Sequence, residues 1–174
     1  MKKKIKIGLI GPNTSGCSAE LYQFGVKLGN SISSKNRIFF CGGAGGFMEA
    51  VSKGLKSSDS TYSGQTIGIL QSDNSKNANE YIDIAIPTGI GIARNIILIN
   101  TSDIIISAGG GAGTLSEIAF AWQKKKVVLC VTKFGGWAEE LAGVDLDKRT
   151  KGLLIPQKSI SDIINYLKKF EDQL

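Results

Sequence analysis

The sequence predicts an α/β domain in which a mainly parallel sheet carries helices on both faces. Two observations lead to this fold class. The strand-like runs are continuously apolar rather than alternating, which is typical of parallel strands buried on both faces. Helical segments lie between these runs, and strands that alternate with helices build a doubly wound, Rossmann-like sheet. The 174 residues suit one domain, residues 1–174, with a sizeable core.

The expected elements follow one another along the chain. We expect strands at residues 5–10, 37–41, 66–70, 82–86, 103–107, 127–131 and 152–155. We expect helices at residues 18–28, 47–55, 90–100 and 114–124, and a last one that begins at Ser159. Ser159 and Asp162 form a capping-box pattern ahead of an apolar stripe. The polar segment 71–80 is expected to be a surface loop.

The composition excludes several kinds of chemistry. The chain has no histidine, so acid–base catalysis by histidine and any Ser-His-Asp or Cys-His pair are excluded. Its three cysteines lack metal-ligand spacing, and we expect no metal site. An odd number of cysteines fits a reduced, cytoplasmic protein.

Charge and hydropathy also limit the partners. No apolar run is long enough to cross a bilayer, and the basic start of the chain runs into a short strand rather than a signal peptide. The net charge of +6 is compatible with an anionic small ligand or with weak affinity for nucleic acid. The lysines are scattered or lie near element ends, so a solvated surface is the better interpretation. We therefore expect neither a nucleic-acid nor a membrane partner.

The segment 104–117, IIISAGGGAGTLSE, is the strongest functional signal. It is interpreted as a buried strand, a glycine loop and a helix that opens at Thr114. Glycines let the backbone approach a ligand closely, and the first N–H groups of a helix attract an anion. The predicted ligand is a phosphate, bound by Gly110, Gly111, Ala112, Gly113 and Thr114. The alternative is a tight strand-to-helix turn with no ligand.

Two more glycine-rich loops follow strands that should end at the same edge of the sheet. Ligands of open α/β sheets bind at that edge, so three such loops indicate a crevice of nucleotide size. The first loop, GPNTSGCS, nearly matches a P-loop, but Cys17 replaces the lysine that reaches the phosphates, which argues against an ATPase or kinase. Candidate ligand contacts are Gly11, Asn13, Ser15, Gly42 and Gly43 in the two loops, and Met48 just after the second, although Met48 could instead be a core residue.

Glu117 and Arg94 are the candidate charged residues of this crevice. Thr114 and Glu117 match a capping box, and the alternative places Glu117 beside the phosphate loop, where it could act on a sugar. Arg94 lies in a largely apolar helix, where a guanidinium needs an anionic partner. It could instead lie at the surface or pair structurally with Asp83 or Asp103.

Taken together, the segments CGGAGGFMEA, ARN and GGGAGTLSE resemble the LONELY GUY family of cytokinin riboside 5′-monophosphate phosphoribohydrolases. The chain is still more similar to the bacterial sister branch that includes the molybdenum cofactor carrier proteins. The resemblance extends from Lys4 to about Val131. Gly109 replaces the proline of the family's PGGxGTxxE motif, Ser116 replaces the first glutamate of its Glu-Glu pair, and Ile90–Gly91 replaces a longer Met-His-Glu run. These departures point to the carrier-like branch.

The resemblance implies one function as the main hypothesis, hydrolysis, and a second as its alternative. In the first, Arg94 and Glu117 are catalytic and hydrolyse the N-glycosidic bond of a nucleoside 5′-monophosphate to base and ribose 5-phosphate, with no required cofactor. In the second, the crevice holds a pterin phosphate such as the molybdenum cofactor, or a nucleotide, without chemistry, as a carrier or sensor. The resemblance also implies a homo-oligomer, dimer or tetramer, with the helices around Arg94 and Thr114 near the interface.

Overall fold

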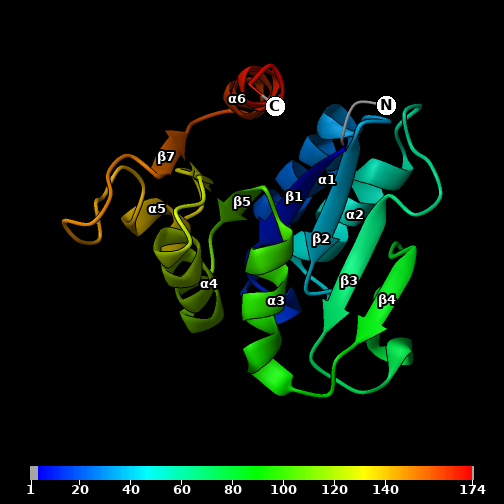
Figure 1. The fold of residues 1–174 in the computed structure, drawn as a ribbon. Coiled ribbons are helices and arrows are strands. Elements are labelled where there is room, and N and C mark those ends of the chain that lie inside the picture. The colour runs from blue at the N-terminus through cyan, green and yellow to red at the C-terminus, as the bar shows by residue number, and fades with distance from the viewer. Residues whose placement is uncertain (1–3, 174) are drawn as a thin grey trace.

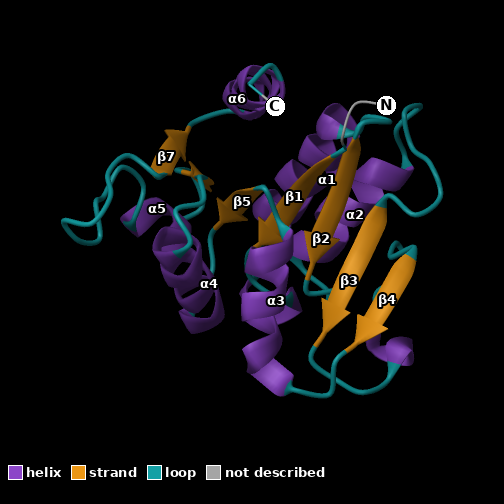
Figure 2. Cartoon of the chain, viewed as in Figure 1, coloured by secondary structure: helices purple, strands orange, loops and turns teal. Residues whose placement is uncertain are grey.

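The computed structural model describes residues 4–173, and these residues form a seven-stranded parallel sheet (Figures 1 and 2). The order of the strands is β4-β3-β2-β1-β5-β6-β7. The strands are β1 (Ile5–Ile10), β2 (Arg37–Cys41), β3 (Thr66–Leu70), β4 (Ile84–Pro87), β5 (Ile104–Ala108), β6 (Val128–Val131) and β7 (Leu154–Gln157). The direction of the strand order reverses between β1 and β5, which is where ligands bind in sheets of this kind.

Helices cover both faces of the sheet. They are α1 (Ala19–Ile32), α2 (Phe47–Lys56), α3 (Arg94–Thr101), α4 (Ala112–Gln123), α5 (Gly136–Glu140) and α6 (Ile160–Glu171). One apolar core packs α1, α2 and α6 against one face, and a second core packs α3 and α4 against the other. Figure 1 shows α1 and α2 behind the strands and α3 in front of them. The predicted doubly wound, Rossmann-like α/β fold is therefore confirmed.

Most predicted elements are observed, with shifted ends. The fourth strand begins at Ile84 rather than at residue 82, because Ile82 still lies in a turn, where its N–H donates to the carbonyl of Asn79 (3.2 Å). Pairing with β3 starts only at Asp83, whose N–H donates to the carbonyl of Thr66 (3.0 Å). A short 3-10 helix, η3 (Gly91–Ala93), precedes α3 where one continuous helix was predicted. Helix α5 was not predicted, since its five residues carry no apolar period.

The opening of α4 corrects the prediction at Thr114. The helix begins at Ala112, with Gly111 as its N-cap, and no side chain caps it. Thr114 is therefore already inside the first turn, and the capping box of Thr114 and Glu117 does not form. Glu117 is consequently free to face another part of the molecule.

The structure also bears on membranes and metals. Within residues 4–173, no helix is both long and apolar enough to span a bilayer. The same residues contain no group of three or more cysteine, aspartate or glutamate side chains arranged to hold a metal ion.

Candidate functional site

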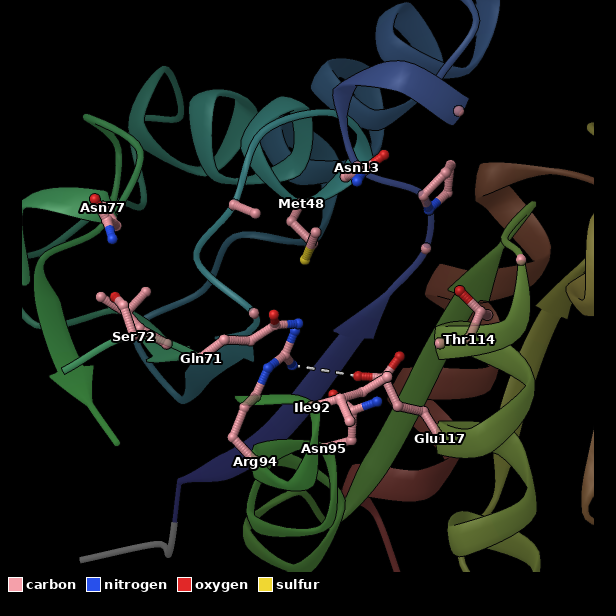
Figure 3. Close-up of a pocket in the computed structure, with 18 residues that line it drawn as sticks. Asn13, Met48, Gln71, Ser72, Asn77, Ile92, Arg94, Asn95, Thr114 and Glu117 are labelled. Carbon is pink, nitrogen blue, oxygen red and sulfur yellow. Dashed lines mark hydrogen bonds and ion pairs between the residues drawn. The ribbon is translucent and has the colours of Figure 1, made fainter. Parts of the chain in front are cut away.

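A cavity of about 620 Å³ opens at the carboxyl ends of the strands (Figure 3). Its walls come from the loops after β1, β2 and β3 and from the N-terminal halves of α2, α3 and α4. All three glycine-rich segments that were predicted to share this edge contribute residues to the cavity wall, the third of them at the start of α4. Its size matches that of ordinary small-molecule sites.

A buried ion pair lies in the wall of the cavity. Nη1 of Arg94 is 3.3 Å from Oε1 of Glu117, and the two residues are 6% and 5% exposed (Figure 3). Burial raises the pKa of the Glu117 carboxyl to about 7, although the neighbouring Arg94 guanidinium acts in the opposite direction. A carboxyl with a pKa near neutrality can both accept and donate a proton at physiological pH.

The alternative partners considered for Arg94 are engaged elsewhere. Asp83 pairs with Lys56 and also accepts hydrogen bonds from Thr66. Asp103 lies 3.5 Å from the ammonium group of Lys6 and accepts a hydrogen bond from that residue's backbone. Arg94 is neither a surface residue nor paired with Asp83 or Asp103, and its partner is Glu117.

Gly42 sets the position of the Arg94 guanidinium. The backbone of Gly42, just after β2, lies directly against the guanidinium, where even a methyl group would collide with Nη2. The close approach explains why glycine stands at this position. Nε of Arg94 is buried and has no hydrogen-bond partner among the described residues, so the pair is incomplete.

The first turn of α4 presents free backbone N–H groups. The first hydrogen bond at its start runs from the N–H of Leu115 to the carbonyl of Gly111 (3.0 Å), so the preceding N–H groups lack helical acceptors. Apart from adjacent residues and the backbone of the helix itself, nothing lies within 4 Å of where a β-carbon would stand at Gly111 or Gly113, so the backbone is open on that side. Such a helix start favours an anion.

The neighbouring helix supports the glycine loop from outside the cavity. The backbone N–H groups of Trp137 and Ala138, at the start of α5, donate to the carbonyls of Gly110 and Gly109, both at 3.1 Å. Gly110 has a φ of 96°, a conformation that favours glycine. The loop is thus held in its shape by the protein alone.

The structure brings most of the predicted site residues together. The predicted residues that line the cavity are Gly11, Asn13, Gly42, Met48, Arg94, Gly111, Gly113, Thr114 and Glu117. Those outside the lining are Ser15, Gly43, Gly110 and Ala112. The hydroxyl of Ser15 donates to Oδ1 of Asn13 (2.8 Å), and Gly43 packs against Leu70.

Several lining residues were not predicted. Gln71 and Ser72 follow β3 at the edge that holds the glycine loops, and that position was the signal that could have identified them. Asn95 is a polar residue within an apolar helix and is only 2% exposed. Its Nδ2 donates to Oγ of Ser116 (3.1 Å), whereas its Oδ1 has no partner among the described residues.

Comparison with known proteins identifies relatives across nearly the whole chain. A protein of unassigned function from Archaeoglobus fulgidus is 40% identical over 126 residues, which is 72% of this chain and 79% of that protein. The structure of the molybdenum cofactor binding protein from Rippkaea orientalis superposes with a TM-score of 0.81 at 32% identity and covers 98% of this chain and 99% of that one.

The molybdenum cofactor carrier protein of Chlamydomonas reinhardtii gives a TM-score of 0.80 at 30% identity over 95% of this chain and 98% of that one. The model of the SLOG cluster4 family matches residues 4–164. These matches confirm the resemblance found in the sequence motifs. The chain belongs to the SLOG cluster4 family, within the superfamily of LONELY GUY and molybdenum cofactor carrier proteins.

Proposed function

We propose that this protein binds the phosphorylated pterin of the molybdenum cofactor in the cavity and carries it without chemical change. The observation that carries the proposal is the likeness, over nearly the full chain, to proteins described as binding or carrying that cofactor. At 32% and 30% identity, these structures share more than a common fold with this chain.

The cavity has features that fit such a ligand. The open start of α4 suits the phosphate, because its free N–H groups and helix dipole favour an anion. Gln71, Ser72 and Asn95 supply hydrogen-bonding side chains for a polar heterocycle. The guanidinium of Arg94 supplies a positive charge for an anionic cargo.

The carrier proposal is tested by retention of the cofactor. The purified protein is mixed with molybdopterin released from a molybdoenzyme, the free ligand is removed, and the retained pterin is measured by fluorescence after oxidation. We expect about one pterin per chain, recovered with its phosphate intact. Loss of all pterin during the separation would contradict the carrier function.

A second candidate is hydrolysis of a nucleoside 5′-monophosphate, and the Arg94–Glu117 pair favours it. Hydrolysis adds water across the N-glycosidic bond, with the hydroxyl on C1′ of ribose and the proton on the base. A carboxylate beside C1′ can stabilise the oxocarbenium-like transition state or activate the water, and Arg94 would orient that carboxylate. Phosphate binding at α4 would position the ribose.

Chromatography of the products separates the two functions. Incubation with AMP should release adenine if the protein is a hydrolase, and Glu117→Gln should reduce release at least 100-fold, as expected on removal of a catalytic carboxylate. Glu140→Gln, an exposed residue of α5, is the matched control and should retain activity. Bound but intact AMP would support a carrier or sensor.

We also propose that the protein is a homo-oligomer, and exposed isoleucines support this. Ile84 and Ile86 on β4 are 47% and 41% exposed, and Ile90 and Ile92 ahead of α3 are 49% and 62% exposed. Exposed apolar clusters commonly mark interfaces. Light scattering should report at least a dimer, and Ile86→Lys should shift the protein toward monomer; a monomeric wild-type protein would contradict the proposal.

A further inference from the structure

We propose that Asn95 selects the ligand's heterocycle by accepting a hydrogen bond from one of its N–H groups. This inference rests on the proposed function, in that the cavity binds a phosphate-bearing ligand with a nitrogen heterocycle. It adds which group of the ligand's ring is recognised: an amino group or a ring N–H, and not a carbonyl alone.

The direction of the hydrogen bonds around Asn95 fixes which atom is available. Oγ of Ser116 lies 2.7 Å from the carbonyl of Gly113 and can reach it only by donating its single proton. The same oxygen must therefore accept from Nδ2 of Asn95, at 3.1 Å. Oδ1 is then the atom left without a partner, so Asn95 offers the ligand an acceptor.

The surroundings of Asn95 make this acceptor selective. Asn95 is 2% exposed, and Oδ1 has no hydrogen-bond partner among the described residues. A buried acceptor without a partner costs free energy, which a donor on the ligand would recover. Asn95 contributes to the cavity wall beside the Arg94–Glu117 pair (Figure 3), so the donor would come from the cavity.

Only a heterocycle that carries an N–H donor can satisfy the Oδ1 acceptor of Asn95. Pterin and guanine rings both carry an amino group and a ring N–H side by side, and either group can donate to Oδ1. A heterocycle without an N–H donor leaves Oδ1 unpaired and adds its own lone pairs nearby. Sites that hydrogen-bond a ligand group reject analogues that lack it more strongly than apolar pockets reject a missing methylene.

The test compares GMP with purine riboside 5′-monophosphate, which has the same phosphate and sugar but no N–H on its base. Binding is measured by calorimetry for the wild type, Asn95→Leu and the control Asn100→Leu, an exposed position on the same helix. We expect the wild type and the control to bind GMP roughly tenfold more tightly than the analogue, and Asn95→Leu to bind the two alike.

Ser116→Ala tests the fixed direction of the Asn95 amide. Without Ser116 the amide can rotate and offer Nδ2 instead, so we expect the preference for GMP to shrink while the affinity for the analogue is kept or rises. A general loss of structure would instead weaken the binding of both ligands together, and thermal unfolding of each variant checks for this.

The outcomes separate this inference from the proposed function. Equal binding of GMP and the analogue by the wild type, or an unchanged preference in Asn95→Leu, would overturn the role of Asn95 and leave the phosphate site intact. Failure of the wild type to bind either nucleotide or ribose 5-phosphate would instead overturn the proposed phosphate site, and the inference with it.

Discussion

Two pairs of arginine and glutamate lie at opposite ends of the sheet, and they differ in how completely they are bonded. At the amino end, Arg37 donates from Nε and Nη2 to the two carboxylate oxygens of Glu171 (2.6 and 2.9 Å) and from Nη1 to the carbonyl of Ile32 (3.0 Å). At the carboxyl end, Arg94 makes one contact of 3.3 Å with Glu117, and its Nε has no partner among the described residues.

This difference indicates that the first pair stabilises the fold, whereas the charged groups of the second pair remain available to a ligand. The bidentate bonds of Arg37 join the start of β2 to the end of α6. They occupy the guanidinium N–H groups and the carboxylate oxygens that a ligand would otherwise contact. Arg94 and Glu117 are buried at the cavity with bonding capacity left over, which is costly unless a ligand uses it. We expect mutation of the first pair to change stability and mutation of the second to change binding and pH response.

The largest expected effect is on the pH dependence of stability through Glu117. Its pKa is about 7 in the folded protein against an ordinary value of 4.5, so the folded state holds this proton more tightly. Stability from this group is therefore complete below about pH 4.5 and is lost as the pH rises to about 7, by at most about 3 kcal/mol.

Glu117→Gln imitates the protonated side chain and removes this loss. Relative to the wild type, the variant should gain free energy of unfolding as the pH rises from about 4.5 to about 7, and the gain should then remain constant. Urea unfolding across this range measures the difference. Parallel profiles for the two proteins would show that burial does not perturb Glu117.

A smaller effect is expected at the closed pair. Arg37→Met keeps the apolar stem but leaves Glu171 without its partner, and the side chain of Glu171 is 29% exposed, so water relieves part of the cost. We expect a loss of about 2 kcal/mol in the free energy of unfolding. Ligand affinity should stay at the wild-type value, and a weaker affinity would mean that the two ends of the sheet are coupled.

The fold could be predicted because its signals are local. Continuous apolar runs indicated the buried strands, and the capping pattern at Ser159 indicated the start of α6, where its hydroxyl accepts from the N–H of Asp162 (3.1 Å). The ends of elements were less certain, as at Ile84 and Ala112, because they depend on hydrogen bonds to residues distant in the sequence or on backbone geometry.

The site could be predicted only in part. Glycine loops and charged residues in apolar helices are visible in the sequence, which is how Arg94 and Glu117 became candidates. The partner that each selects is a tertiary property: Asp83 and Asp103 were the partners considered for Arg94, and the packing of α3 beside α4 brought Glu117 to it instead. Asn95 was missed because its importance lies in an atom without a partner, which no sequence pattern displays.

The smallest expected effect tests whether the open pair depends on the placement of Arg94. In Gly42→Ala the new methyl group would collide with the guanidinium, which is the flexible end of a side chain and can move away. We expect stability to change by less than about 1 kcal/mol, because no backbone has to shift. Ligand affinity should fall roughly tenfold, since the displaced guanidinium no longer faces the cavity correctly. Calorimetry with GMP measures the affinity and urea unfolding the stability. Asn77→Gln is the matched control for bulk at the cavity, because Asn77 also lines the cavity, is exposed, and lies apart from Arg94 (Figure 3). If both variants weakened binding equally, the cause would be lost space rather than the position of Arg94, and the incomplete pair would lose its assigned part in binding.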